Sequence, residues 1–290
     1  MRKNKPLVVG IGELLWDIFP DSKKAGGAPV NFIYHATQMG AEGCAISAVG
    51  DDALGEEIVR ELEVNHIGNY IEKVGYPTGS VLVELHDGSP SYSIIENVAW
   101  DYIPLTEKAV ELVKSADAVC FGTLAQRSPV SRKTIKSLLS YVPENALRFF
   151  DINLRQHYHS KELIEECLQE ANIFKLNDEE LAALRSMFVI EGSDDDVCRI
   201  FMEKYNLLYL ILTAGSDSST IYSQTEKSFI PTPKVSVADT VGAGDSFSGA
   251  FVYSILNGTS LSEAHQKAVD IAAFVCTQQG AWPPYPENDD

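Results

Sequence analysis

Positive charge is scarce in this chain. Its 23 lysines and arginines stand against 41 aspartates and glutamates, so the formal net charge is −18. Such an acidic surface repels the phosphates of nucleic acids and of anionic membranes, and we expect neither as a partner. Cysteine is scarce too: the five cysteines are far apart and form no C-x-x-C pair. Their odd number and wide spacing argue against a disulfide framework and a zinc site, and favour a reducing cytoplasm.

Long hydrophobic runs are also missing. No stretch approaches the roughly 20 apolar residues of a membrane-spanning helix. Glu13 and Asp17 interrupt the N-terminal segment that could otherwise resemble a signal peptide. We expect poor order only in the acidic, proline-rich end after Trp282. With 290 residues, of which 45% are hydrophobic, the chain can bury a large core, and we expect a single α/β domain over residues 1–290.

Short apolar runs alternate with helical patterns along most of the chain. This is the arrangement of parallel strands that are joined by crossover helices. Buried strands are predicted at 7–11, 44–49, 118–121, 147–150, 173–176 and 208–212. Helices are predicted at 30–39, 54–64, 106–114, 131–141, 161–170 and 197–205. The sequence therefore predicts a doubly wound, mainly parallel sheet flanked by helices.

One segment departs from this alternation. Residues 80–85 and 91–95 are two β-type runs joined by H-D-G-S-P, which predicts a β-hairpin. With a further strand at 14–19, the hairpin is expected to form a small sheet over the C-terminal strand ends, where α/β folds bind ligands. We expect this sheet, built from about residues 13–28 and 79–102, to act as a lid.

The most informative motif is D-T-V-G-A-G-D-S-F-S-G-A-F at residues 239–251. Its glycines permit a tight bend, and the apolar residues that follow recur at helical spacing, so a helix is predicted to begin near Gly242. The N–H groups of Gly242, Ala243 and Gly244 would then lie at the positive end of the helix dipole without intrahelical acceptors. They could bind a phosphate there.

Asp245 lies in the predicted first turn of that helix, where an aspartate has two common uses. It can cap the helix, which is the more frequent role of an aspartate at this position. It can also take a proton from a hydroxyl that attacks a phosphoryl group. Asp239, before the glycines, favours the second interpretation, because it can hold the loop or a cation and leave Asp245 free.

Other ligand-binding motifs are incomplete. Gly10 and Gly12 lie at the end of the first predicted strand, but Leu15 replaces the third glycine of G-x-G-x-x-G, and no G-K-[ST] occurs. The H-Y-H at His157 and His159 lacks a third ligand at suitable spacing. Solvated loop histidines are therefore the preferred interpretation over a metal site.

Together, G-A-G-D-S-F and the early G-G-A-P-V-N at residues 26–31 resemble the ribokinase-like (PfkB) family of sugar kinases. V-G-D-D-x-x-G at 49–55, N-x-x-E at 177–180 and L-T-x-G at 212–215 follow in the order of that family. G-E-x-x-x-D at 12–17 is similar to the fructokinase branch. The resemblance implies a ribokinase-like fold and transfer of the ATP γ-phosphate to a primary hydroxyl of a free sugar, with fructose as the favoured substrate.

The resemblance also implies roles for individual residues. Asp245 would be the general base, and the N–H groups of Gly242, Ala243 and Gly244 would be the anion hole. Sugar binding would fall to Asp17, Gly27, Asn31, Asn153 and Arg155. ATP and its Mg²⁺ would be bound by Lys175, Asn177, Glu180, Thr213 and Gly215. A site for a monovalent cation, K⁺, is implied at Asp239 and the Val241 carbonyl.

Several alternatives stay open at this point. N-x-x-E fits a helix capping box as well as it fits a magnesium site. Ile152 replaces the proline of a family D-P-N-x-R, and residues 91–97 lack an arginine that many fructokinases carry. The substrate could thus be 2-keto-3-deoxygluconate, a nucleoside or another hexose, and a catalytically silent sugar or nucleotide sensor is a further alternative. An exposed edge of the lid also predicts a homodimer.

Overall fold

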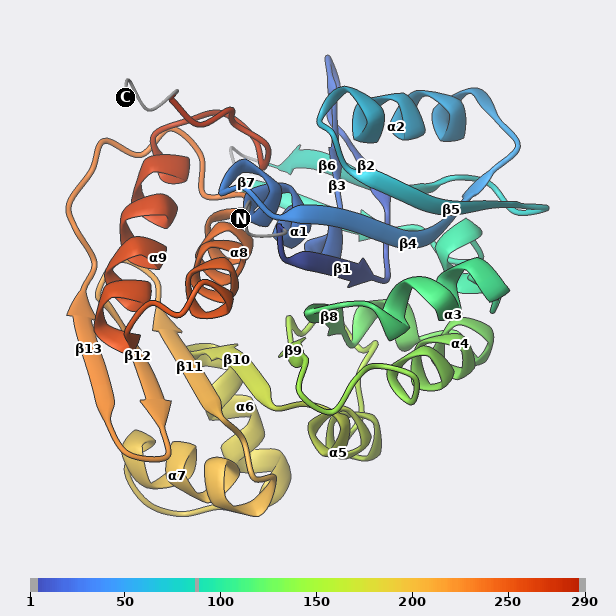
Figure 1. Cartoon of the computed structure of the whole chain (residues 1–290). Helices are drawn as coiled ribbons and strands as arrows, with labels where there is room; N and C mark the ends of the chain where they lie inside the picture. The colour runs from blue at the N-terminus through green and yellow to red at the C-terminus, as the bar shows by residue number, and fades with distance from the viewer. Residues whose placement is uncertain (1–4, 87–88, 287–290) are drawn as a thin grey trace.

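The computed structural model describes residues 5–86 and 89–286, and its main feature is a large sheet (Figure 1). The strand order is β13-β12-β11-β10-β9-β8-β1-β4-β5. Neighbours are parallel except where β12 is involved. The strands are β1 (Leu7–Ile11), β4 (Glu42–Gly50), β5 (Gly68–Val74), β8 (Ala118–Gly122), β9 (Leu147–Asp151), β10 (Ile173–Asn177), β11 (Tyr209–Ala214), β12 (Ser218–Ser223) and β13 (Lys227–Pro231). The predicted doubly wound, mainly parallel sheet is confirmed.

Helices cover both faces of this sheet (Figure 1). One face carries α1 (Ala28–Gln38), α2 (Ala53–Val64), α8 (Ala243–Leu256) and α9 (Leu261–Cys276). The other face carries α3 (Glu107–Lys114), α4 (Pro129–Leu139), α5 (Lys161–Glu170), α6 (Asp178–Phe188) and α7 (Asp194–Lys204). Two short 3₁₀ helices, η1 (Ala99–Tyr102) and η2 (Leu124–Gln126), lie in loops. The six predicted helices are confirmed to within a few residues.

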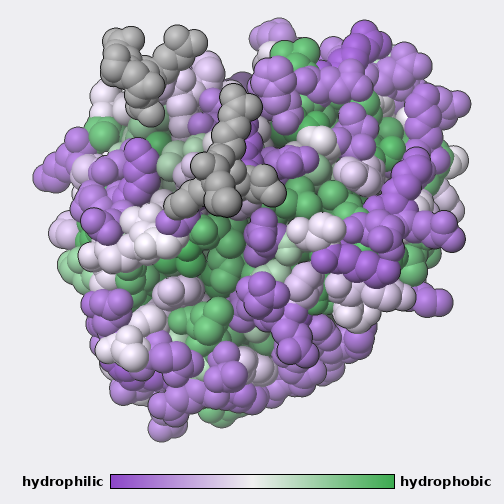
Figure 2. Space-filling model, in the orientation of Figure 1, coloured by the Kyte–Doolittle hydropathy of each residue, from purple (hydrophilic) through white to green (hydrophobic). Residues whose placement is uncertain are grey.

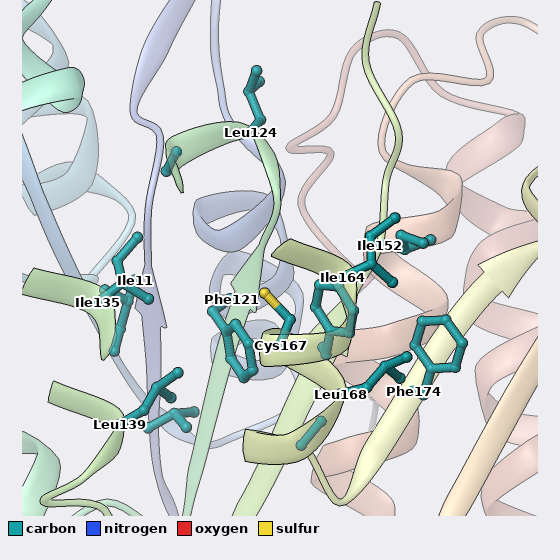
Figure 3. Close-up of a cluster of buried hydrophobic side chains, with 14 of the residues drawn as sticks. Ile11, Phe121, Leu124, Ile135, Leu139, Ile152, Ile164, Cys167, Leu168 and Phe174 are labelled. Atoms are coloured by element: carbon teal, nitrogen blue, oxygen red, sulfur yellow. The ribbon is translucent and has the colours of Figure 1, made fainter. Parts of the chain in front are cut away.

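The central strands are apolar throughout because both of their faces are covered. Along β8, Val119 belongs to the core under α3 to α7, whereas its neighbour Ala118 belongs to the core under α1, α2, α8 and α9. Successive side chains of a strand point to opposite faces, so each strand contributes to both cores. Figure 3 shows the first core, in which Phe121 of β8 and Ile164 of α5 belong to one packed cluster.

A second, four-stranded sheet lies next to α2 (Figure 1) and has the order β3-β2-β6-β7. Its strands are β2 (Leu15–Ile18), β3 (Lys23–Gly26), β6 (Gly79–His86) and β7 (Ser89–Ile94). The antiparallel pairing of β6 with β7 confirms the predicted hairpin, although its turn residues 87–88 lie outside the described part of the chain. Since β2 pairs with β6, the predicted strand at 14–19 joins the hairpin in one small sheet.

Two expectations need correction. Sequence patterns missed β3, β5, β12, β13, α6 and α9, and β13 shows why: this edge strand alternates exposed and half-buried residues and has no apolar run. Of the end after Trp282, which was expected to be poorly ordered, residues 283–286 are instead held against α1, where Tyr285 contacts His35 and Gln38. Residues 287–290 lie outside the described part of the chain. In the described ranges, no helix is long and apolar enough to cross a membrane. Hydrophilic residues dominate the rim of the face in Figure 2.

The strand order creates a crevice at the C-terminal ends of β1 and β8. The chain leaves β1 toward β4 and β5 and later returns to β8 on the opposite side of β1, so the loops after β1 and β8 diverge. Open α/β sheets bind ligands at such a switch point. Glu13 after β1, Thr123 after β8 and Asp151 at the end of β9 line a small cavity there. The candidate site lies around this cavity.

Candidate active site

The glycine turn before α8 lies at the centre of the candidate site. Gly242 precedes the helix with a φ of 80°, and a Cβ on it would lie 2.9 Å from Cα of Ala281, so glycine is required. The N–H of Ala243 makes a long bond of 3.3 Å to the carbonyl of Thr240. No described residue accepts a hydrogen bond from the N–H of Gly242 or of Gly244. These groups remain available to an anion at the positive end of the helix dipole.

Asp245 lies in the first turn of α8, and its carboxylate bonds to a different helix. Its Oδ2 accepts a 2.8 Å hydrogen bond from Nδ2 of Asn31 on α1, and capping of α8 by Asp245 is not observed. Burial raises the pKa of Asp245 to about 6, and repulsion by Asp151 adds to the rise, whereas Lys175, the Asn31 bond and Arg155 oppose it. A carboxylate with this pKa is ionised at neutral pH and can still accept a proton.

A buried ion pair lies beside the glycine turn. Lys175 Nζ is 2.7 Å from Asp151 Oδ2, and the two side chains are 9% and 8% exposed. A Cβ on Gly244 would lie 3.3 Å from Lys175 Nζ, which places the ammonium group next to the turn. Burial lowers the pKa of Lys175, but the surrounding carboxylates, Asp151 first among them, outweigh burial and raise it overall. The turn thus combines free N–H groups with a fixed positive charge.

The loop before α1 holds Gly27 and Asn31 on the other side of Asp245. Gly27 has a φ of 121°, and a Cβ on it would lie 2.2 Å from the carbonyl oxygen of Glu13. The N–H of Ala28 donates to Glu13 Oε1 at 3.3 Å, while Oε2 of Glu13 is buried with no hydrogen-bond partner among the described residues. Burial raises the pKa of Glu13 to about 7. Sequence reasoning missed Glu13, although G-E directly after the first strand could have indicated it.

Asp17 of β2 and Arg155 of the loop after β9 approach each other across the site. No described residue donates a hydrogen bond to the Asp17 carboxylate, and burial raises its pKa to about 6 while Arg155 and Lys24 lower it. Arg155 is exposed and donates to a backbone carbonyl at 3.2 Å. Its charge also lowers the pKa of Glu13 and of Asp245. The guanidinium group therefore lies near three carboxylates from different parts of the chain.

Asn177 and Glu180 form the capping box that the sequence left as an alternative. Asn177 Oδ1 accepts from the N–H of Glu180 at 2.8 Å, and Glu180 Oε2 accepts from the N–H of Asn177 at 2.8 Å, where α6 begins. Oε1 of Glu180 accepts from the N–H of Leu154 at 2.9 Å. Both carboxylate oxygens therefore hold the backbone at the ends of β9 and β10. The described residues contain no group of three or more His, Cys, Asp or Glu side chains that could hold a metal ion.

Three more of the predicted site residues lie at the same edge of the large sheet. Thr213 is opposite Asn177 in the parallel pairing of β10 with β11. Gly215 follows in the turn to β12 with a φ of 48°. Asn153 follows β9 with a φ of 39° and lines the small cavity with Glu13. The predicted nucleotide residues thus lie on the β10 and β11 side, and the predicted sugar residues lie on the side of β1, β9 and the small sheet.

Asp239, before the glycine turn, is bonded to three groups. Its Oδ1 accepts from the N–H of Val241 at 3.1 Å. Its Oδ2 accepts from the N–H of Gly280 at 3.0 Å and lies 3.3 Å from Lys24 Nζ. Burial alone would raise the pKa of Asp239, but these bonds lower it below its ordinary value. Any cation bound at Asp239 and Val241 would therefore lie beside the ammonium group of Lys24, which belongs to the small sheet.

A separate cavity of about 510 Å³ is lined by η1 and by the loops after β8 and β9. His157 and His159 line this cavity, so both belong to loops, as expected. Its wall contains a buried ion pair in which Arg127 donates to both oxygens of Asp101 at 2.7 and 2.8 Å. The Arg127 guanidinium also lies 3.9 Å from the ring centre of Trp100. The same guanidinium lies 4.8 Å from the ring centre of Tyr158, so Arg127 also contacts the loop after β9 that carries Arg155.

The chain is similar to known proteins along nearly its whole length. The sequence profile of the pfkB family of carbohydrate kinases matches residues 15–288. Fructokinase-1 of Oryza sativa subsp. japonica is 28% identical, over 99% of this chain and 96% of its own. ATP-dependent 6-phosphofructokinase of Thermoanaerobacterium thermosaccharolyticum is 25% identical, over 97% and 91% respectively. The crystal structure of a sugar kinase from Pyrococcus horikoshii in complex with ATP has a TM-score of 0.81 and 28% identity, and covers 95% of this chain and 94% of that chain.

Proposed function

Because the chain belongs to the pfkB family of carbohydrate kinases, we propose that it transfers the γ-phosphate of ATP to the primary hydroxyl of free fructose, giving fructose 6-phosphate. The observation that carries this proposal is the juxtaposition of the Asp245 carboxylate with the unbonded N–H groups of Gly242 and Gly244. Phosphoryl transfer needs a base for the attacking hydroxyl and a fixed positive environment for the transferring group. Both are present within one helical turn.

In the proposed reaction, Asp245 takes the proton of the sugar hydroxyl while the hydroxyl oxygen attacks the γ-phosphorus. The new O–P bond forms as the bond between the γ-phosphorus and the bridging oxygen of ADP breaks. The products are the sugar phosphate, ADP and a proton that Asp245 first holds. The N–H groups of Gly242, Ala243 and Gly244, together with Lys175, would stabilise the charge on the transferring group.

The sugar would be held by Asp17, Gly27, Asn31, Asn153 and Arg155. Asp17 supports this role because its carboxylate has no hydrogen-bond donor among the described residues and can accept from sugar hydroxyls. Arg155 supplies several N–H donors on the same side of the site. We propose that the small sheet, with about residues 13–28 and 79–102 of a single domain, closes over the sugar as a lid and excludes water.

ATP would be held by Lys175, Asn177, Glu180, Thr213 and Gly215. The donor chemistry fits Mg²⁺, which prefers carboxylate and phosphate oxygens and keeps several waters. The capping-box oxygens of Asn177 and Glu180 each accept one backbone hydrogen bond and retain a further lone pair. Bound with ATP, Mg²⁺ would neutralise phosphate charge. A monovalent cation such as K⁺ would bind at Asp239 and the Val241 carbonyl.

A second candidate function is phosphorylation of a sugar acid such as 2-keto-3-deoxygluconate. It is favoured by Arg155, whose guanidinium group is exposed at the site and forms no ion pair with any described residue. The two candidates are separated by ADP release with fructose, ribose, glucose, mannose, 2-keto-3-deoxygluconate and fructose 6-phosphate, with and without K⁺. The highest kcat/KM with fructose supports the first proposal, and the highest with the sugar acid supports the second. Sugar binding without ADP release would indicate a sensor and contradict both.

We also propose that the protein is a homodimer that associates through the small sheet. The strands β3 and β7 are edge strands of that sheet, and exposed edges favour pairing with another chain. Leu82 of β6 is 38% exposed, which adds an apolar contact to the same sheet. Light scattering on the purified protein should give twice the 31.8 kDa mass of one chain, and Leu82→Lys should shift it toward one chain. A monomeric wild-type protein would contradict this proposal.

A further inference from the structure

The side-chain amide of Asn31 is hydrogen-bonded at both of its ends. Nε1 of Trp282 donates to Asn31 Oδ1 at 2.7 Å, although the two residues are 251 positions apart in the chain. Nδ2 of Asn31 donates to Asp245 Oδ2 at 2.8 Å. Asn31 is 6% exposed, so water competes little for these bonds. A continuous hydrogen-bonded series therefore runs from Trp282 through Asn31 to Asp245.

The indole of Trp282 determines which way the Asn31 amide points. An indole nitrogen can only donate, so the Asn31 atom that faces it must be the carbonyl oxygen. The NH₂ group then faces Asp245, whose ionised carboxylate can only accept. A rotated amide would place two donors together at Trp282 and two acceptors together at Asp245. The orientation of this amide is thus fixed by chemistry at both ends.

The segment that carries Trp282 is also attached to α1 by bonds that do not involve the indole N–H. Tyr34 OH donates to the carbonyl of Trp282 at 3.0 Å, and the two rings stack with 7° between their planes. Tyr285 OH lies 2.8 Å from His35 Nδ1. Tyr34 and His35 follow Asn31 by three and four positions, so both lie on the same side of α1 as Asn31. Removing the indole N–H alone leaves these attachments in place.

We propose that Trp282 is a positioning residue for phosphoryl transfer, and that its N–H acts through the Asn31 amide on Asp245. The proposal rests on the proposed function, in which Asp245 is the general base. A hydrogen bond to an ionised carboxylate favours the ionised form. Without the Trp282 N–H, the amide is free to rotate, Asp245 loses a fixed donor, and a smaller fraction of the enzyme holds an ionised base at a given pH.

Other charged groups also face Asp245. They come from four further elements and comprise Asp151 of β9, Lys175 of β10, Arg155 of the loop after β9 and Glu13 of the loop after β1. None of them bonds to Trp282. Substitution of the indole leaves these charges where they are, so a change in the pH dependence can be assigned to the amide.

Trp282→Phe tests the proposal, because phenylalanine keeps a ring against Tyr34 and removes the N–H. The pH dependence of kcat/KM reports ionisation in the free enzyme. We expect the pH of half-maximal kcat/KM to rise by about one unit, since a charge-assisted hydrogen bond contributes about that much. For a half-point near pH 6, this is about a fivefold loss at pH 6 and about 1.1-fold at pH 8. An unchanged half-point would overturn the proposal.

Tyr285→Phe is the matched control. It removes the hydroxyl that contacts His35, so it loosens the same segment on α1 but leaves the indole N–H with Asn31. We expect it to lower the melting temperature about as much as Trp282→Phe does while the pH dependence stays that of the wild type. An equal upward shift in Tyr285→Phe would show that Trp282 merely holds the segment, and the proposal would be wrong.

A double mutant tests whether the effect passes through the amide. In an Asn31→Ala background, Trp282→Phe should cause no further shift of the half-point, because the connecting group is gone. Two shifts that add fully would contradict the proposal. Asp245→Asn separates this inference from the proposed function: wild-type turnover in Asp245→Asn removes the base assignment itself. An inactive Asp245→Asn together with an unshifted Trp282→Phe removes the role of Trp282 alone.

Discussion

The two ends of the glycine turn carry the same residue type in opposite surroundings. Asp239, before the turn, accepts hydrogen bonds from two backbone N–H groups and contacts Lys24, and its pKa is lowered. Asp245, after the turn, accepts one hydrogen bond and lies near Asp151, and burial raises its pKa to about 6. One aspartate is a permanent anion that anchors the loop. The other can exchange a proton near neutral pH, which is what a general base requires.

The largest expected effect comes from removing the base. Asp245→Asn keeps the size of the side chain but cannot take a proton from the sugar. We expect kcat to fall by about 10² to 10⁴-fold, the usual contribution of general-base catalysis. A coupled assay of ADP release measures this loss, and thermal-shift binding of sugar and ATP serves as the control for an intact site. Turnover within a factor of about three of the wild type would exclude Asp245 as the base.

The pH dependence of the wild-type enzyme should follow the ionisation of Asp245. Its raised pKa of about 6 means that the base is protonated, and so inactive, below that pH. We expect kcat/KM to increase with pH, to reach half its maximum near pH 6, and to be about tenfold lower at pH 5 than at pH 8. Asp239→Asn should leave the half-point unchanged, because Asp239 is already ionised throughout this range. A flat profile between pH 5 and pH 8 would contradict the assignment.

Replacing Asp239, which anchors the loop before the glycine turn, should remove hydrogen bonds that hold this loop and so lower the stability of the protein. The amide in Asp239→Asn can accept through one oxygen, so one of the N–H groups of Val241 and Gly280 loses its partner, and Lys24 loses its counter-charge. Loss of such bonds costs on the order of 2 kcal/mol of the free energy of unfolding. We expect the melting temperature to fall by about 4–6 °C and kcat by up to about tenfold. A melting temperature equal to that of the wild type would show that Asp239 is no anchor.

Replacing Asp245, after the glycine turn, by asparagine should stabilise the folded protein at high pH. Because burial raises the folded-state pKa of Asp245 above its ordinary value, its contribution to stability is present below about pH 4 and is lost as the pH rises through about 6. An asparagine at this position carries no charge, so Asp245→Asn does not lose stability as the pH rises. We expect its melting temperature to exceed that of the wild type by about 2–4 °C at pH 8, which corresponds to on the order of 1 kcal/mol in the free energy of unfolding. Calorimetry at pH 4 and pH 8 measures the difference. A decrease at pH 8 would mean that the surroundings of Asp245 favour its ionised form.

The smallest expected effect concerns Lys24 and K⁺. The Lys24 ammonium already supplies a positive charge 3.3 Å from Asp239, from a partly exposed position. A partly exposed ion pair of this kind contributes little free energy, so K⁺ can compete with Lys24 for Asp239. We expect K⁺ to raise wild-type activity by about two- to threefold. Lys24→Met should show a larger stimulation, because K⁺ then meets no competing cation at Asp239. Equal stimulation of both proteins would show that Lys24 and K⁺ act independently.

Much of the fold could be predicted from local patterns. The apolar runs of β1, β8, β9 and β10 are recognisable because both faces of the sheet are covered, and the start of α8 at the glycine turn was placed correctly. β13 was missed because one of its edges is free and its residues alternate in exposure. α9 was missed although Ser260 and Glu263 form a capping box at its start, which is a signal that the sequence does carry.

The site was predictable in part. Asp245, Asn31 and the glycines were recognised by their motifs, and the structure brings Asn31 and Asp245 into contact although they are 214 positions apart. Asn177 and Glu180 could not be decided, because a capping box and a magnesium site require the same residues at the same spacing. The structure shows the capping box. Glu13 and Trp282 were overlooked as site residues, and for Trp282 the sequence offers no signal.

The sequence by itself determined most strands of the large sheet, most of the helices and the positions where only glycine fits, because these depend on periodicity and on backbone conformation within a few residues. It also supplied both aspartates of the glycine turn and the family motifs around them. The motifs already predicted Asp239 as the loop anchor and Asp245 as the base, but only the tertiary structure shows how the surroundings of the two carboxylates differ. That difference depends on burial and on partners such as Asn31, Gly280 and Lys24, which come from distant parts of the chain. The pKa of a carboxylate follows from those surroundings, and no local pattern records them.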